Sequence, residues 1–310
     1  RHMAEAADVR ARYETALERL MDEVREDHNI LAAILCGSLS HDQVWEKSDI
    51  DLVLVTIDGV TGHGVVINAD DINVHTSVMT RSAFKQRLDG ATRNSFGHSL
   101  FAKATLIFAR DPSIEQLFDE LNLIGERDTT IQQLQSLSEL LSSLYKAEKW
   151  FYVKNDLNYA ALWLLFTGNA LAQMVVGREG KLVAREVIAD AMEIEPALFQ
   201  VIYVDLLNKK KTKKGVAAAI DAVNAYIDRH RDRVCAPVLD YLRETGEPRS
   251  MTELNHHFHR NYNIESVVLV CEWLADSGLI DKVSTPVKLT KKSRKSIDEL
   301  GFFYLSPDGF

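Results

Sequence analysis

The amino-acid sequence predicts an α+β protein: a mixed β-sheet with flanking helices, then an α-helical bundle, then a C-terminal module of helices and a β-hairpin. Residues 30–109 contain short apolar runs, several of which alternate with period two, as half-buried strands do. Residues 129–233 repeat apolar side chains at three- and four-residue steps, as packed helices do. We therefore expect domains at residues 4–125, 129–233 and 234–310.

Composition restricts the class of protein. The 310 residues are 46% hydrophobic and 26% charged, as in ordinary soluble proteins. A net charge of −9 argues against broad, non-specific binding of nucleic acid by the whole molecule. Cys36, Cys235 and Cys271 lie far apart without metal-ligand spacing, which favours a reduced, cytoplasmic setting. No run of about 18 apolar residues is present, so we expect no membrane partner.

The N-terminal elements follow from the same patterns. An amphipathic helix is expected over residues 5–26, and it can pack on a first strand, Ile30–Leu35. A Gly-Ser turn and a polar loop over 39–48 lead to a second strand, Ile50–Thr56. Further strands are expected at residues 65–68, 71–79 and 106–109, and helices from Arg81 and over 114–123.

Two carboxylates introduce the second strand. Asp49 and Asp51 are two residues apart in an extended segment, so their side chains point to the same face, opposite Ile50 and Leu52. Neighbouring carboxylates repel each other, and a cation between them keeps both ionised. Hard oxygen ligands favour Mg²⁺ or Mn²⁺.

The Gly-Ser turn supplies a second chemical feature. Gly37 lets the backbone approach a ligand closely, and successive N–H groups at such a turn can hold an anion. The hydroxyl of Ser38 adds a donor. A phosphate cradle facing a carboxylate pair predicts a site for a metal-bound nucleoside triphosphate.

These residues resemble a known signature. Gly37-Ser38, ten intervening residues and then Asp49-Ile50-Asp51-Leu52 are similar to the Gly-Ser…Asp-x-Asp motif of the DNA polymerase β-like nucleotidyltransferases, and a more general similarity to small-molecule nucleotidyltransferases covers roughly the first 120 residues. The resemblance implies an enzyme, dependent on Mg²⁺ or Mn²⁺, that transfers a nucleoside monophosphate from an NTP to an acceptor hydroxyl. Asp49 and Asp51 would be catalytic metal ligands, and we expect a small-molecule acceptor.

The family also implies a third carboxylate, on the strand expected at residues 71–79. Asp71, Asn73 and His75 share the strand face that should meet the carboxylate pair. The favoured register puts Asn73 at the family's acidic position, and asparagine can ligate a metal but cannot take a proton. Asp71, as a metal ligand, or His75, as a catalytic base, are the alternatives.

The remaining site predictions concern the nucleotide. Ser48 and Arg81 are expected to join Gly37 and Ser38 in binding it, Arg81 through triphosphate oxygens. Because the third carboxylate is missing at position 73, the alternative function is a weakly active or inactive nucleotide-binding, antitoxin-like module that acts through a protein partner.

The sequence of the C-terminal half predicts a helical bundle followed by a module that resembles a winged helix. The family resemblance implies that the bundle closes one wall of the active-site cleft, which makes candidates for ligand contact of Tyr145, Lys149, Trp150, Tyr152 and Tyr159. An aromatic stripe at helical spacing is, however, more often core. Three helices are expected at residues 237–245, 252–260 and 264–276. An apolar strand that opens at 278–280 and a segment at 287–290 that pairs back across a turn should follow, an order that resembles a winged helix. The third helix carries acids and no Lys or Arg, which argues against sequence-specific DNA binding. We expect this module to contact a protein partner or a second copy.

Overall fold

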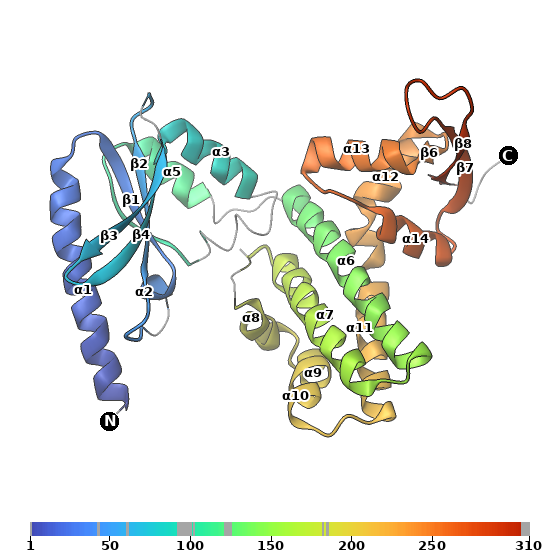
Figure 1. Cartoon of the computed structure of the whole chain (residues 1–310), viewed down its shortest axis with the longest axis horizontal. Helices are drawn as coiled ribbons and strands as arrows, with labels where there is room; N and C mark the ends of the chain where they lie inside the picture. The colour runs from blue at the N-terminus through green and yellow to red at the C-terminus, as the bar shows by residue number, and fades with distance from the viewer. Residues whose placement is uncertain are drawn as a thin grey trace. The chain divides into compact units, whose positions relative to one another are not determined.

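The computed structural model describes residues 2–41, 44–59, 62–91, 101, 103–120, 126–181, 183 and 186–304. The chain forms two compact units. Unit 1 comprises residues 1–124 with 182–185, and unit 2 comprises residues 125–181 with 186–310. Figure 1 shows a twisted sheet with helices in unit 1 and a mainly helical unit 2.

Unit 1 is built on a five-stranded mixed sheet in the order β3-β4-β2-β1-β5. β2 and β4 run parallel, and the other neighbours are antiparallel. The strands are β1 (Ile30–Cys36), β2 (Ile50–Thr56), β3 (His63–Ala69), β4 (Ile72–Thr80) and β5 (Thr105–Ala109). The helices are α1 (His2–Glu26), α2 (Ser38–His41), α3 (Arg81–Ala91) and α5 (Pro112–Glu120). The prediction of an α+β protein with a mixed sheet is confirmed.

Each face of this sheet has its own apolar core. α1 covers one face, where Tyr13, Leu17 and Leu20 pack with Ile50 and Leu52. α3 and α5 cover part of the other face, where the core residues are Ala32, Ile34, Cys36, Val53, Val55, Met79, Phe84, Leu88, Phe101 and Ile114. Because side chains alternate along a strand, Asp51 points to the α3 face, opposite to its neighbours Ile50 and Leu52.

Two local predictions in unit 1 were wrong. The segment after Gly37 was expected to be a loop, but Ser38–His41 forms the short helix α2. Asp71 was expected in the fourth strand, but it lies with Asp70 in the two-residue turn between β3 and β4, both with positive φ (50° and 62°). Aspartate tolerates this left-handed conformation better than most residues, which is why a turn forms at Asp70-Asp71.

Unit 2 begins with a long antiparallel helix pair, α6 (Glu126–Glu148) and α7 (Leu157–Arg178), joined by the π-helical turn η1 (Lys149–Val153). Asp156 caps α7 by accepting hydrogen bonds from the backbone N–H groups of Asn158 and Tyr159. The helices that follow are α8 (Val187–Ile194), α9 (Pro196–Phe199), η2 (Gln200–Val204), α10 (Asp205–Asn208) and α11 (Lys213–Val234). The helical content predicted for this part of the chain is confirmed.

The C-terminal elements of unit 2 pair differently from the prediction. They are α12 (Ala236–Thr245), β6 (Arg249–Ser250), α13 (Met251–Tyr262), α14 (Val268–Asp276), β7 (Asp281–Val287) and β8 (Ile297–Phe303). The strands form a sheet in the order β6-β8-β7. The hairpin predicted from segments 278–280 and 287–290 was wrong, because β7 pairs with β8 and the cationic stretch 288–295 lies in the connection. The small strand β6 was not predicted.

Among the described residues, α7 is the one helix long and apolar enough to cross a membrane, and 67% of its most apolar window is buried within the protein. Ala160, Leu164, Leu171 and Val175 line its buried side. Its apolar composition is therefore largely accounted for by packing within unit 2.

A polar cluster lies at the C-terminal end of α7. The guanidinium of Arg178 donates to Glu195 (3.0 Å) and to the hydroxyl of Tyr226 (3.4 Å), and it lies 3.3 Å from Nε2 of His230. Burial lowers the pKa of His230, and the charges of Arg178 and Arg229 lower it further. Burial raises the pKa of Tyr226 to about 12, so it stays neutral. The cluster thus accommodates the positive charge of Arg178 and disfavours a second positive charge on His230.

We expect unit 2 to lose stability as the pH falls below the unfolded-state pKa of histidine, about 6.5. The folded-state pKa of His230 is lower, so between these two values the unfolded chain binds more protons, and stability falls with falling pH. The change His230→Gln should reduce this dependence in thermal unfolding followed by tryptophan fluorescence between pH 7 and 5. The matched control is His259→Gln, at an exposed position on α13. Identical pH profiles for wild type and His230→Gln would contradict this account.

Candidate functional site

The strand register brings several predicted residues into one row. Asp51 on β2 is opposite Cys36 on β1 and His75 on β4, and His75 is opposite Val66 on β3. Residues directly opposite in a ladder point to the same face, so Val66, His75, Asp51 and Cys36 lie side by side across the sheet. This is the α3 face. A concave surface of about 320 Å³ extends over this row and part of the next, within the size range of small-ligand sites.

The bend after β1 lies against Asp51. Gly37 has φ +70°, the left-handed conformation that glycine adopts without strain. A Cβ placed on Gly37 would lie 2.3 Å from Oδ2 of Asp51 and 3.2 Å from its Cγ. A glycine is therefore required here for two reasons, backbone conformation and the space taken by the carboxylate. The structure brings together these two predicted site residues.

Asp49 lies next to His75. Their Oδ2 and Nε2 atoms are 3.5 Å apart, and both side chains are about half exposed. The loop before Asp49 is fixed by Tyr13 of α1, whose hydroxyl donates to the carbonyl of Ser48 (2.6 Å). Burial raises the pKa of Tyr13, with a further contribution from the negative charge of Asp49. The pattern of the helix expected over residues 5–26 does not indicate this polar role of Tyr13.

Other predicted residues lie around this row or away from it. Asn73 is exposed on β4, one pleat before His75 on the same face, and pairs with Asn68. Asp71 lies in the turn beyond Asn73, about 13 Å along the strand from His75. Ser48 closes its own turn, since its hydroxyl oxygen accepts from the N–H of Trp45 (3.1 Å). Ser38 begins α2, and its side chain lies outside the described part of the structure.

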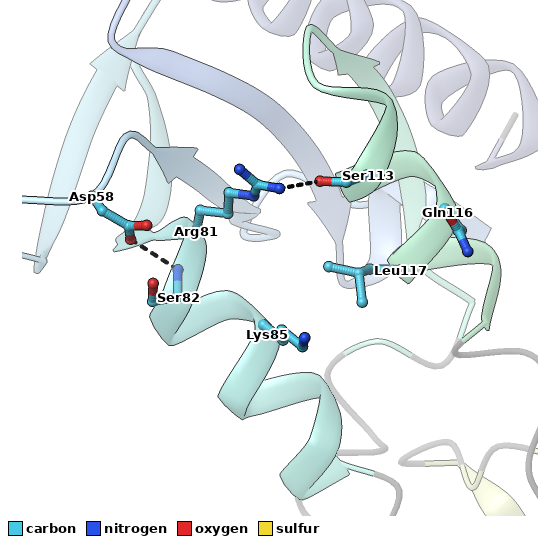
Figure 2. A pocket seen from close by; sticks show the side chains of 7 residues that line it. All are labelled: Asp58, Arg81, Ser82, Lys85, Ser113, Gln116 and Leu117. Atoms are coloured by element: carbon cyan, nitrogen blue, oxygen red, sulfur yellow. Dashed lines mark hydrogen bonds between the residues drawn. The ribbon is translucent and has the colours of Figure 1, made fainter.

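Arg81 is not brought to this site. It lies six residues beyond His75, which is about 20 Å along an extended strand. There its guanidinium contacts Asp111 (3.2 Å) and donates to the hydroxyl of Ser113 (2.7 Å). Figure 2 shows this second pocket, where Asp58 also accepts from the N–H of Ser82 (3.0 Å). The predicted contact between Arg81 and triphosphate oxygens at the carboxylates is therefore not supported by its position.

Arg87 of α3 supplies the cation that sequence analysis missed. It lines the same concave surface as Asp51, His75 and Cys36. Burial, followed by the charge of Asp51, raises the pKa of the Cys36 thiol to about 12, and the charge of Arg87 opposes this shift. Burial and the neighbouring carboxylate therefore both favour the neutral thiol form of Cys36. The sequence feature that could have indicated this role is the position of Arg87, about two turns into the helix that follows the fourth strand.

The donor set suits a hard divalent cation shared with a substrate. In the described ranges, no three His, Cys, Asp or Glu side chains come close enough together to form a metal cage by themselves. Mg²⁺ is usually bound by one or two carboxylates together with substrate phosphates and water. Asp49 and Asp51, next to the open bend at Gly37, fit that mode of binding.

The fold is nucleotidyltransferase-like. The crystal structure of a nucleotidyltransferase-like protein from Exiguobacterium sibiricum 255-15 is similar to this chain with a TM-score of 0.64. The similarity covers 95% of this chain and 100% of that protein at 16% sequence identity, so it establishes fold alone. No protein-family model matches the sequence, and no curated protein sequence matches it.

Gly37→Ala should displace the Asp51 carboxylate, because the new methyl group would occupy its position. The matched control is Gly59→Ala, since Gly59 also has a positive φ (92°) but a Cβ added there would meet no atom within 4 Å. We expect each variant to lose roughly 1 kcal/mol of stability from backbone strain. Only Gly37→Ala should also lose Mn²⁺-dependent binding of an NTP, measured by calorimetry. Equal binding by the two variants would show that Asp51 does not need this space.

Proposed function

We propose that this protein is a metal-dependent nucleotidyltransferase that transfers a nucleoside monophosphate from an NTP to an acceptor hydroxyl. The observation that carries this proposal is the close approach of the Gly37 bend to the Asp51 carboxylate, on an open sheet face that also holds Asp49 and His75. The nucleotidyltransferase-like fold supports it.

In this proposal Asp49 and Asp51 hold Mg²⁺ or Mn²⁺, which when bound neutralises charge on the transferring phosphoryl group. Gly37 and Ser38 would face the phosphates, since Gly37 has no side chain where its backbone packs against Asp51. Arg87 takes the electrostatic role predicted for Arg81, since it lines the same surface.

The transfer step needs a group that accepts a proton. The acceptor oxygen forms a bond to the α-phosphorus, the bond from that phosphorus to the bridging oxygen breaks, and pyrophosphate leaves. The base that we propose is His75, and its position opposite Asp51 and next to Asp49 supports this choice. With a proton on Nε2 directed at Asp49, Nδ1 is left to accept. His75 would thus replace the family's third carboxylate as the base.

The acceptor we propose is a small molecule, and a cationic one suits an acidic protein and a carboxylate-bearing surface.

For the C-terminal elements α12 to β8 we propose a winged-helix-like module, supported by the order of three helices and a three-stranded sheet. Its third helix, α14, carries Glu272 and Asp276 and no Lys or Arg, which favours contact with a protein over reading of DNA bases.

The carboxylates provide the direct test. Asp49→Asn and Asp51→Asn should each lower nucleotidyl transfer by about 100-fold or more, because metal-derived charge stabilisation is worth several kcal/mol. The assay measures pyrophosphate release from each NTP with Mg²⁺ and a panel of small cationic acceptors. The matched control is Asp71→Asn, which removes an exposed carboxylate from the nearby turn and tolerates the left-handed conformation. Loss of activity in Asp71→Asn alone would contradict the assignment.

The base is tested separately. His75→Ala should lower kcat by about 10²- to 10⁴-fold with little change in the KM for NTP, as expected for loss of a general base. Asn73→Ala, one pleat away on the same face, should retain activity. A gain in turnover in Asn73→Asp, with none lost in His75→Ala, would show that His75 is not the base and that position 73 is where the family's carboxylate acts. Nucleotide binding without turnover, in wild type and in Asn73→Asp, would favour a nucleotide-binding module that acts through a protein partner.

A further inference from the structure

The first half of α7 exposes large apolar side chains that helical spacing would ordinarily bury. Tyr159, Leu162 and Phe166 are 50%, 44% and 55% exposed. With the half-buried Trp163 they lie at steps of three and four residues, on one side of the helix. The opposite side, with Ala160, Leu164 and Leu171, forms the core of unit 2. The exposed stripe therefore does not contribute to the core described for this unit.

Ring contacts join this stripe to η1 and link two of its own members. Trp150 of η1 stacks on Tyr159 with ring centroids 4.5 Å apart and an angle of 24°. Trp163 lies 5.5 Å from Phe166, and Nζ of Lys146 lies 4.3 Å from the centre of the Trp163 ring. We call Trp150, Tyr159, Leu162, Trp163 and Phe166 the aromatic face of unit 2.

Lysines outnumber acids next to the aromatic face, in a protein whose net charge is −9. Lys146, Lys149 and Lys154 lie beside it, and α7 contains no Asp or Glu. Segment 146–156 also holds two acids, whose positions are fixed by hydrogen bonds within the chain: Glu148 accepts from Asn224 (3.1 Å) and Asp156 caps α7. In Figure 1 the lysine-rich connection between α10 and α11 is drawn at the same end of unit 2 as η1.

We propose that the aromatic face binds single-stranded nucleic acid. Exposed rings stack on unpaired bases, and neighbouring lysines neutralise the phosphates. Asn158 and Asn169, exposed on the same side of α7, supply amides for base edges. A duplex has its base faces covered, so rings on a convex helix contact single strands selectively. The proposal is independent of nucleotidyl transfer, because it concerns a surface of unit 2 and needs no NTP.

The charge pattern decides against two other occupants. A second copy packed about a two-fold axis would bring the three lysines of each aromatic face towards those of the other, with only Glu148 and Asp156 as nearby acids, and both of these already have hydrogen-bond partners within their own chain. A lipid surface would leave the asparagine amides unpaired in an apolar layer. A polyanion with exposed π-faces complements the lysines, the rings and the amides together.

The test uses the full chain and short fluorescein-labelled oligo-dT and oligo-U strands, with binding measured by anisotropy at several salt concentrations. Tyr159→Ala and Phe166→Ala should each weaken binding by between about 5- and 100-fold, the range for one stacked base. Three lysine–phosphate contacts predict a slope of log K against log salt of about −2, and Lys149→Gln should reduce its magnitude by about 0.7. The matched controls, Leu289→Ala and Lys181→Gln, lie at exposed positions away from the aromatic face and should bind like wild type.

Three results would overturn the proposal. The first is that neither labelled strand binds, or that the controls weaken binding as much as the aromatic variants do. The second is a dimer in sedimentation velocity that Phe166→Ala dissociates, without oligonucleotide binding, which would assign the face to a second copy. The third is binding to anionic lipid vesicles, lost in Phe166→Ala, in the absence of oligonucleotide binding.

Discussion

The candidate site of unit 1 depends on the close packing of the Gly37 backbone against the Asp51 carboxylate. The antiparallel pairing of β1 with β2 sets this contact, since Cys36, the last residue of β1, is opposite Asp51. The chain then turns through the left-handed conformation at Gly37, and a methyl group at that position would overlap the carboxylate. The end of β1 therefore determines both the bend at Gly37 and how closely that bend lies to the carboxylate of Asp51. The positions of His75 and Arg87 follow from elements that pack around this pair.

The features of the site that could be predicted from sequence are those that period-two alternation determines, namely the extent of a strand and the face to which each side chain points. The strand Ile50–Thr56 was predicted with the bounds that the structure gives, and Asp51 points away from the core that contains Ile50 and Leu52. The face shared by Asn73 and His75 followed from the same rule. Alternation does not fix how far one strand slides along another, however. The pairing of Asp51 with His75 therefore became visible only in the ladder between β2 and β4.

The predictions that failed depended on contacts distant in sequence or on turn chemistry. Arg81 follows the fourth strand, but a strand of nine residues carries it to the opposite end of the sheet, to Asp111 and Ser113. In the C-terminal module a strand was predicted to open at residues 278–280 and to pair with residues 287–290. In the structure β7 begins at Asp281 and pairs with β8, and the cationic residues 288–295 connect these two strands. The exposure of Tyr159 and Phe166 was also beyond sequence reasoning, because helical spacing is the same for a buried stripe and an exposed one.

The hydrogen bond from Tyr13 to Ser48 links two parts of the chain that are 35 residues apart. The loop that carries Asp49 is thereby anchored to the N-terminal helix as well as to its own strand. A chain shortened to begin after Tyr13 would keep every residue of the Gly-Ser…Asp-x-Asp pattern and still lack this anchor. The candidate site of unit 1 therefore depends on α1 as well as on the motif and the sheet that displays it.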